Sequence, residues 1–188
     1  MSDALDTAFA LIMDAEGGAA LSMVRSDPGN WTGGKVGSGS LRGTRYGISA
    51  AAFPSVNIGA LTEAQAKSLF ETKYWSAVRG DDLPGALALL AVDAAFNGGH
   101  PIQWIQGAAG QEMDGDLGPI TLAAVQRAFA GPDAGSAVLA DVAASHLGYL
   151  AGLPTWTTFG ARGGEPLGWS TRLTSMLVAA ARLSTADA

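Results

Sequence analysis

A nearly uninterrupted apolar segment after Pro84 constrains the fold more than any other part of the sequence. Residues 86–96 read ALALLAVDAAF, and Gly98-Gly99 follow one residue later. Proline is favoured at the start of a helix and glycine just past its end, so this segment predicts a helix that begins at Pro84 and stops before Gly98. A helix that is apolar on most faces is buried. We therefore expect it at the centre of a helical core.

A single carboxylate, Asp93, interrupts this apolar helix. It stands between Leu89 and Phe96, on a side that we expect to be buried. A buried carboxylate needs hydrogen-bond partners. Asp93 is therefore either a structural tether or a catalytic group, and the apolar surroundings favour the tether.

An amphipathic helix is predicted near the N-terminus, from about residue 3 to residue 15. Apolar residues recur there at the spacing of one helical face; they are Leu5, Ala8, Phe9, Ile12 and Met13. Glu16 lies eleven residues after Leu5, which at roughly 100° per residue returns to within about 20° of the same direction. The Glu16 carboxylate is therefore expected to point toward the core side.

Gly17 and Gly18 follow Glu16 and are a typical helix stop signal. Partial burial and the negative end of the helix dipole would both favour a protonated Glu16. A carboxyl group that is kept neutral can serve as a general acid. The alternative is an ordinary C-terminal glutamate whose side chain bends back to solvent.

The composition favours one mainly helical domain and excludes several classes of chemistry. The 188 residues are 48% hydrophobic, include 26 glycines and no cysteine, and carry a net charge of −6. The negative charge argues against nucleic acid as the main partner, and the lack of cysteine excludes disulfides and a thiol nucleophile. Zinc-binding histidine spacings, a nucleophile elbow, a phosphate-binding loop and a dinucleotide fingerprint are all missing. We expect no metal and no cofactor, which leaves carboxylate chemistry.

The sequence also gives expectations about targeting and membrane insertion. Its first ten residues contain aspartates and no lysine or arginine, unlike a secretory signal peptide. No apolar run approaches the roughly 20 residues of a membrane span. We expect a protein made in the cytoplasm, with no membrane insertion and a monomeric state.

A glycine-rich segment over residues 19–47 is expected to form a long loop with one or two short hairpin strands. From Pro28 to Thr62 no acidic residue occurs, and three cations do: Lys35, Arg42 and Arg45. Such a segment can be an ordinary solvated loop. Loops this long inside a compact domain are more often functional.

The remaining helices follow from their start and stop signals. Thr62 and Gln65 match a capping box that opens a helix fading near Trp75. Further helices are predicted from Pro101 to about 107–110, from Pro119, over about 134–151 and over about 169–183. The run Asp114-Gly115-Asp116 invites a calcium-loop interpretation, but the other ligands of such a loop are missing, so a turn is favoured.

Two carboxylates and a threonine form a candidate catalytic set: Glu16, Asp27 and Thr44. Cleavage of a sugar acetal needs an acid at the leaving oxygen and a group that presents water or stabilises the oxocarbenium ion. Glu16 suits the first role. Asp27 suits the second, with the Thr44 hydroxyl orienting water. Asp27 precedes Pro28-Gly29 and is equally well explained as a turn initiator.

The order of the short motifs resembles glycoside hydrolase family 108, the muramidases of phage-endolysin and secretion-activator type. The matching elements, in chain order, are Glu16-Gly17-Gly18, Asp27-Pro28-Gly29, Thr44-Arg45-Tyr46-Gly47-Ile48, KYW at 73–75, RGDDLP at 79–84 and DAAFNGG at 93–99. The later part resembles the family's peptidoglycan-binding region, at residues 103–106, MDGDLGPITL and GWSTR at 168–172. In the family the Asp-x-Gly element and the threonine lie closer together. Here NWTGGKVGSGSLRG separates them, and GARGGEPL is a second insertion before Gly168.

This resemblance implies a mainly α, lysozyme-like fold in which the glycine-rich loop and a short β-hairpin frame the cleft. It implies a catalytic lobe over residues 1–100 and a helical, peptidoglycan-binding lobe over residues 101–188. It also implies that Glu16 is the catalytic acid of an N-acetylmuramidase.

The expected reaction is cleavage of the β-1,4 bond between N-acetylmuramic acid and N-acetylglucosamine in bacterial peptidoglycan. Five residues of the glycine-rich segment are expected to contact this substrate: Trp31, Lys35, Arg42, Arg45 and Tyr46. Two alternatives stay open, namely a lytic transglycosylase acting on the same bond and a non-catalytic wall-binding or secretion-accessory module. The enzyme would act in the periplasm after release through a membrane hole or by dedicated export.

Overall fold

The computed structural model describes residues 3–131, 133–154, 156 and 168–186. The insertion GARGGEPL lies outside the described residues. Between residues 28 and 82 the chain also forms short 3-10 turns and one π-helical turn (Glu71–Trp75). The α-helices are α1 (Asp3–Ala15), α2 (Glu63–Phe70), α3 (Gly85–Phe96), α4 (Pro101–Ala108), α5 (Pro119–Phe129), α6 (Ser136–Ala151) and α8 (Gly168–Ala186).

Within the described residues the sheet content is one antiparallel pair, β1 (Thr44–Arg45) and β2 (Ile48–Ser49). The prediction of a mainly α, lysozyme-like fold is confirmed. Helix positions follow the sequence signals closely, because the capping residues act locally. At α2, for example, the Thr62 hydroxyl accepts from the Gln65 amide N–H, and the Gln65 side chain accepts from the Thr62 amide N–H.

The chain packs as two compact units, and the division falls inside α1. We call Met1–Leu11 with Tyr74–Ala188 the helical unit, and Ile12–Lys73 the loop unit. The expected lobes over residues 1–100 and 101–188, packed as one compact unit, are a separate division that stays a prediction. Within the helical unit, α3 packs against α4, α6 and α8. The assignment of residues 101–188 to peptidoglycan binding concerns function and stays a prediction.

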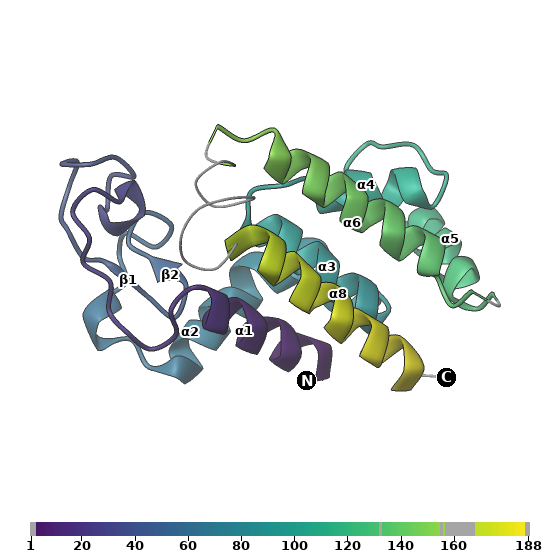
Figure 1. Ribbon diagram of the computed structural model, residues 1–188, viewed down its shortest axis with the longest axis horizontal. Coiled ribbons are helices and arrows are strands. Elements are labelled where there is room, and N and C mark those ends of the chain that lie inside the picture. Colours follow the sequence, from purple (N-terminus) through teal and green to yellow (C-terminus); the bar gives the residue numbers. More distant parts are fainter. Residues whose placement is uncertain (1–2, 132, 155, 157–167, 187–188) are drawn as a thin grey trace. The chain divides into compact units, whose positions relative to one another are not determined.

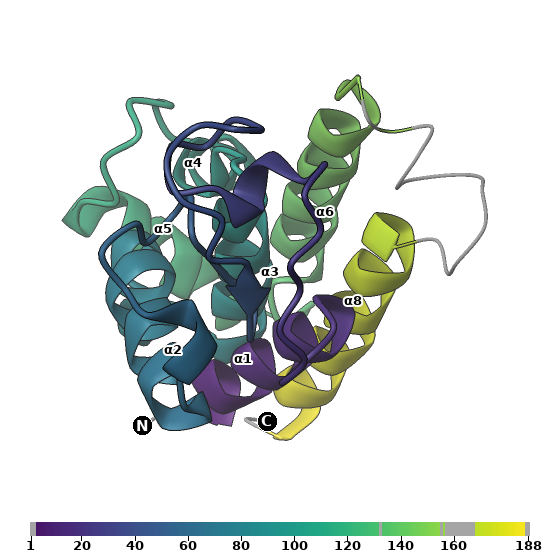
Figure 2. The same cartoon turned by 90° about the vertical axis from the view of Figure 1, so that its left-hand side faces the viewer.

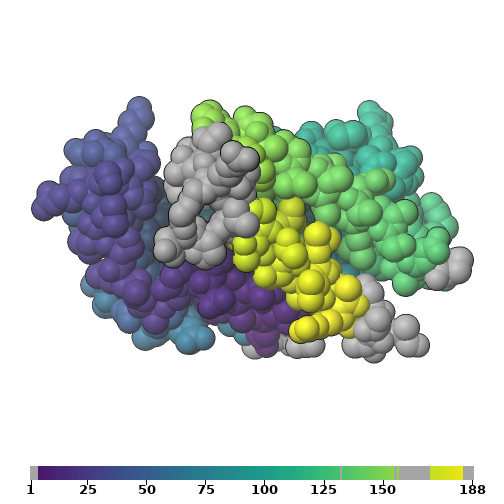
Figure 3. Space-filling model, in the orientation of Figure 1, coloured from purple at the N-terminus to yellow at the C-terminus, as the bar shows by residue number. Residues whose placement is uncertain are grey.

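The core of the helical unit is built around α3, as its apolar sequence requires. Every residue of α3 from Ala86 to Ala94 is buried. Helices α8 and α6 lie along it (Figure 1), and α6 and α8 also touch each other. Figure 3 shows these two helices side by side at the surface of the unit. No helix among the described residues is both long and apolar enough to span a membrane.

Asp93 is the buried tether that the sequence favours. Its side chain is 1% exposed, and its Oδ1 lies 3.0 Å from Nε of Arg172, which is 4% exposed. Asn97 extends the cluster, since its Nδ2 donates to the Asp93 carbonyl at 2.7 Å and its Oδ1 accepts from the Arg172 guanidinium. A buried charge is tolerated when it is paired and hydrogen-bonded. The cluster therefore joins α3 to α8 at a fixed register.

His146 of α6 completes the surroundings of Asp93. Its ring is 1% exposed and stacks on Trp104, with 5.7 Å between ring centroids. Its Nδ1 lies 3.6 Å from Asp93 Oδ2, too far for a hydrogen bond. Burial, and secondly the positive charge of Arg172, lower the pKa of His146 to about 4. His146 is therefore neutral near pH 7.

The motifs KYW and RGDDLP contact each other in the turn before α3. A Cβ added at Gly80 would lie 2.3 Å from the Trp75 ring, so only glycine fits there. The Trp75 indole donates to Asp81 Oδ1 at 3.1 Å, and Arg79, in the left-handed region, pairs with Asp82 at 2.7 Å. These residues fix the turn that leads into α3.

The run Asp114-Gly115-Asp116 forms a turn, as favoured over a calcium loop. The buried Gln106 side chain holds it, accepting from the Gly115 amide at 2.8 Å and donating to Asp114 Oδ1 at 2.5 Å. The backbone N–H of Asp116 also donates to Asp114 Oδ1, and these two donors, the Asp116 amide first, lower the pKa of Asp114. The carboxylate is thus committed to the turn.

Replacing Arg172 by methionine should destabilise the protein by about 3–5 kcal/mol, because Asp93 would remain buried without its counter-ion. Urea unfolding of the variant and of the wild type measures this loss. The control is Arg127→Met, an exposed arginine on α5, which should change stability by less than about 0.5 kcal/mol. Equal effects of the two changes would contradict the tether role.

Stability should fall as the pH is lowered from about 6.5 to 4. In this window the unfolded chain protonates His146, whereas the folded state, with a pKa of about 4, resists protonation. The difference corresponds to a loss on the order of 3 kcal/mol that is complete near pH 4. Urea unfolding at a series of pH values should show a flatter profile for His146→Phe than for His100→Phe, the matched change at the exposed histidine. Parallel profiles would contradict this assignment.

Candidate active site

The three catalytic candidates and the five expected substrate-contact residues all lie in the loop unit, Ile12–Lys73. The loop unit begins with the last turn of α1, which ends as the Gly17-Gly18 signal predicts. Both glycines have positive φ, and the Gly18 N–H donates to the Met13 carbonyl at 2.8 Å. This is the six-to-one hydrogen bond of a Schellman cap.

Glu16 is the last residue before the chain turns left-handed, and it is exposed. The expectation that it points toward the core is wrong. The apolar stripe itself is as predicted, with Leu5, Ala8, Phe9, Ile12 and Met13 all buried. The last buried residue of the stripe is Met13, α1 ends at Ala15, and the chain leaves the helix direction at Gly17. The carboxylate is instead presented at the surface of the loop unit.

β1 and β2 form a hairpin that reaches the end of α1. Residues Tyr46 and Gly47 connect the strands, and both have positive φ, 52° and 65°. This is the pattern of a type I′ turn, which matches strand twist but disfavours a side chain at the first position. Figure 2 shows the strands of this hairpin beside α2, in agreement with the contacts between β2 and α2.

Two pairings connect the Glu16 segment to this hairpin. The Tyr46 N–H donates to the Gly18 carbonyl at 2.9 Å, which helps to hold Tyr46 in its unusual conformation. Ser22 and Thr44 exchange both backbone hydrogen bonds, at 2.8 and 3.0 Å. The segment that follows Glu16 is therefore joined to β1 by an isolated antiparallel bridge between Ser22 and Thr44.

Thr44 is half-buried, and its hydroxyl has a defined partner. Thr44 Oγ1 donates to Asn30 Oδ1 at 2.7 Å. Asn30 is 0% exposed, and its Nδ2 donates to the Val24 carbonyl at 3.0 Å. Its own carbonyl accepts from the Arg42 and Gly43 amides. Asn30 therefore fixes three neighbouring stretches of chain around Thr44.

Asp27 serves the turn that its sequence context suggests. It is exposed and caps the 3-10 turn Pro28–Asn30, with Oδ1 accepting from the Gly29 N–H at 2.8 Å. This turn brings Asn30 into position under Thr44. A structural role for Asp27 is thus visible, and a chemical role remains a prediction.

Arg45 connects two separate stretches of the loop unit through its guanidinium group. Its Nε donates to the Ala19 carbonyl at 2.9 Å and its Nη1 donates to the Gly59 carbonyl at 3.0 Å. The guanidinium carbon also lies 5.2 Å from the centroid of the half-buried Tyr46 ring. Since carbonyls already hold the guanidinium, Arg45 stabilises the path of the chain just after Glu16.

The insertion between Asp27 and Thr44 is an ordered ribbon. Backbone hydrogen bonds join Thr32 to Ser40 and Gly33 to Ser38, and a bridge pairs Trp31 with Leu41. The two remaining cations of this segment are exposed. Lys35 opens the tight turn that ends at Ser38, and Arg42 donates to the Pro54 carbonyl at 3.1 Å. Trp31 is half-buried, and its indole donates to the Arg25 carbonyl.

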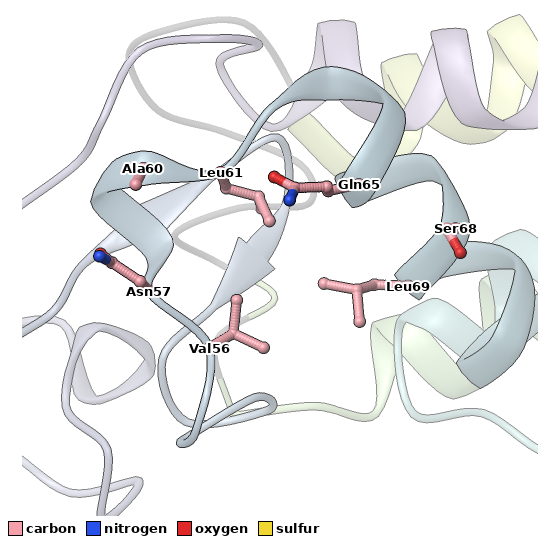
Figure 4. Close-up of a pocket in the computed structure, with 7 residues that line it drawn as sticks. All are labelled: Val56, Asn57, Ala60, Leu61, Gln65, Ser68 and Leu69. Carbon is pink, nitrogen blue, oxygen red and sulfur yellow. The ribbon is translucent and has the colours of Figure 1, made fainter.

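The loop unit also contains an open pocket of about 390 Å³. Val56, Leu61 and Leu69 point toward one another across it (Figure 4). Its polar lining consists of Asn57, Gln65 and Ser68, without a titratable side chain. None of the three catalytic candidates lines this pocket. Across the described part of the chain, no three acidic or histidine side chains cluster in a way that could hold a metal ion.

Comparison with known protein families identifies a match over the region that contains these residues. The model of the family "Glycosyl hydrolase 108" matches residues 9–99, a range that contains all the candidate residues. Residues 9–99 are therefore similar to this glycosyl hydrolase family. The resemblance predicted from the motifs is therefore confirmed.

A solved structure supports the same fold over nearly the whole chain. The structure of SagA from Brucella abortus has a TM-score of 0.69 and 26% sequence identity, and the match covers 95% of this chain and 97% of that one. No curated protein matches the chain significantly. The chain is therefore similar to glycosyl hydrolase family 108 over residues 9–99 and to SagA over nearly its whole length.

Asn30 is the site residue that the sequence did not reveal. It directly follows Asp27-Pro28-Gly29, but an asparagine after a turn signal is more often solvated than buried. The contact that makes it important spans fourteen residues, to Thr44. Only the folding back of the hairpin brings the two side chains together.

Gly43→Ala should break the pairing next to Thr44. A Cβ there would lie 2.3 Å from the Ser22 carbonyl oxygen, at φ +83°. Gly37→Ala is the matched control, since Gly37 has φ +79° and open space around it. The control should cost about 1 kcal/mol from backbone strain alone, and Gly43→Ala about 1–3 kcal/mol more.

Thermal unfolding and amide hydrogen exchange at Ser22 and Thr44 measure these effects. Exchange at both amides should accelerate in Gly43→Ala and stay as in the wild type in Gly37→Ala. The same loss of stability in both variants would show that the close approach at Gly43 is unimportant.

Proposed function

We propose that this protein hydrolyses the β-1,4 bond between N-acetylmuramic acid and N-acetylglucosamine in peptidoglycan, with Glu16 as the general acid. One observation carries this proposal. Within the family-matched region, Glu16 is presented at the end of α1, and the chain after it pairs directly with the strand that carries Thr44. An acid and a water-positioning hydroxyl are thus held by one hydrogen-bonded framework.

The proposed reaction is a single displacement that uses three groups: Glu16, Thr44 and Asp27. The bond from the anomeric carbon to the leaving oxygen breaks as that oxygen takes the proton of Glu16. A water that Thr44 orients forms the new bond to the anomeric carbon, and its proton passes to the carboxylate of Asp27. The turn occupies Oδ1 of Asp27. Proton exchange with solvent then restores Glu16 and Asp27.

Substrate contacts are also proposed for residues of the glycine-rich segment. Lys35 and Arg42 are exposed cations that suit the carboxylates of muramic acid and the peptide stem. Trp31 and Tyr46 suit sugar faces, which pack on aromatic rings. Arg45 supports this surface through its clamp on Ala19 and Gly59.

The later part of the chain is proposed to assist binding to the wall. Residues 101–188 carry the motifs that resemble a peptidoglycan-binding region. We also propose that the enzyme reaches its substrate in the periplasm, after release through a membrane hole or by dedicated export.

Glu16→Gln should lower kcat about 10²–10⁴-fold, since an amide cannot donate the proton that the leaving oxygen needs. Release of soluble muropeptides from purified peptidoglycan measures the rate. The control is Glu63→Gln, an exposed glutamate in the first turn of α2, which should keep full activity. An unchanged rate in Glu16→Gln would remove Glu16 from catalysis.

Mass spectrometry of the same digests separates this proposal from its alternatives. Hydrolysis leaves reducing muramic acid ends, whereas anhydro-muramyl ends throughout would identify a lytic transglycosylase. Binding to the wall without any release of muropeptides would indicate a non-catalytic module. The defined hydroxyl of Thr44 favours hydrolysis, because only that reaction uses a positioned water.

A further inference from the structure

We infer that Asn30 positions the attacking water, by fixing the direction in which the Thr44 hydroxyl donates its proton. This inference rests on the proposed hydrolysis and adds a residue to it. The side chain of Asn30 forms hydrogen bonds with Val24 and Thr44, so its proposed effect passes through Thr44 and it is a positioning residue.

The Val24 carbonyl sets the orientation of the Asn30 side-chain amide. The Val24 carbonyl can only accept hydrogen bonds, and it takes one from Asn30 Nδ2 at 3.0 Å. Nδ2 must therefore face Val24, which leaves Oδ1 facing Thr44. At 0% exposure, no solvent competes for either group.

The orientation of Thr44 follows from that of Asn30. Because Oδ1 can only accept, the Thr44 hydroxyl must be the donor in the 2.7 Å bond between them. Its proton is thus committed inward, and its oxygen lone pairs stay available on the outer side. Thr44 can then accept a hydrogen bond from water but cannot donate one to it.

The fixed directions of these two hydrogen bonds determine how Thr44 can bind a water molecule. A water that donates one hydrogen to Thr44 Oγ1 presents its own lone pairs elsewhere and keeps its second hydrogen for a base. That is the orientation a nucleophile needs. With the opposite polarity, Thr44 would donate to the water and occupy one of the two lone pairs from which the water can attack the anomeric carbon.

The side chain of Asn30 is the part that carries this effect. Its backbone carbonyl independently binds the Arg42 and Gly43 amides, and its backbone N–H belongs to the Asp27 turn. Substitution of the side chain leaves those backbone bonds available. The structural and the positioning contributions of Asn30 can therefore be separated by mutation.

Two near-isosteric variants form the first test. Asn30→Leu removes both side-chain bonds, whereas Asn30→Asp removes the donor to Val24 and keeps an acceptor for Thr44. We expect kcat on purified peptidoglycan to fall about 10- to 100-fold in Asn30→Leu and to be largely restored in Asn30→Asp, with KM unchanged in both. Equal kcat values in these two variants would overturn the inference. Asn57→Ala, at an exposed asparagine of the loop unit, is the control.

A double-mutant cycle then asks whether Asn30 acts only through Thr44. Thr44→Val keeps the shape of the side chain and removes the hydroxyl, and it should lower kcat about 100-fold, whereas Thr44→Ser should retain most of it. When Asn30→Leu is added to the Thr44→Val variant, kcat should change by less than about twofold. A further loss as large as that in the wild type would show a purely structural role for Asn30.

A measurement on the wild-type protein guards against variants that do not fold. The Thr44 hydroxyl proton should exchange slowly enough to be seen by NMR, with a nuclear Overhauser contact that places it toward Asn30. A rapidly exchanging hydroxyl proton, or an Asn30 amide proton directed at Thr44 Oγ1, would overturn the inference. Full activity of Thr44→Val would instead contradict the water role of Thr44, and full activity of Glu16→Gln the proposed hydrolysis itself.

Discussion

The buried ion pair between Asp93 and Arg172 is the interaction on which the helical unit depends. α3 is apolar enough to be surrounded on nearly all sides, and helices α4, α6 and α8 pack against it. A single carboxylate in such a helix is costly unless a partner arrives from a neighbour. Arg172 supplies the charge, and Asn97 and the neutral ring of His146 occupy the remaining space around it. One polar contact thereby selects which helix packs against α3, and at which register.

The loop unit depends on a different kind of constraint. Its glycine-rich segment, residues 19–47, buries little apolar surface, so backbone hydrogen bonds and the buried Asn30 carry the structure of that segment. The pairs Gly18–Tyr46 and Ser22–Thr44 join the end of α1 to the hairpin, and Arg45 adds two carbonyl bonds beside them. Such a framework has many directional contacts and few interchangeable ones. It can therefore hold an acid and a hydroxyl in defined places.

Much of the local structure could be predicted from the sequence, because its causes are local. The Gly17-Gly18 cap, the capping box at Thr62, and the turn at residues 114–116 depend on residues a few positions apart. The same is true of the buried stripe of α1, although its extrapolation to Glu16 fails. The Glu16 N–H still donates to the Ile12 carbonyl at 3.0 Å, but α1 ends at Ala15, so no later turn of the helix extends the buried stripe around Glu16. The motif order likewise predicted the family without any knowledge of contacts.

The sequence by itself determined the mainly helical class, the positions of most helix ends, the central place of α3 and the candidate residues Glu16, Asp27 and Thr44. The tertiary structure alone decided their surroundings. It exposed Glu16, committed one oxygen of Asp27 to a turn, engaged Arg45 as a clamp and placed Asn30 beneath Thr44. The physical reason is the separation in sequence over which each interaction acts. Caps and periodicity act within a turn or two of helix, whereas the polarity of the Thr44 hydroxyl depends on Val24 and Asn30, which only the folded chain brings to it.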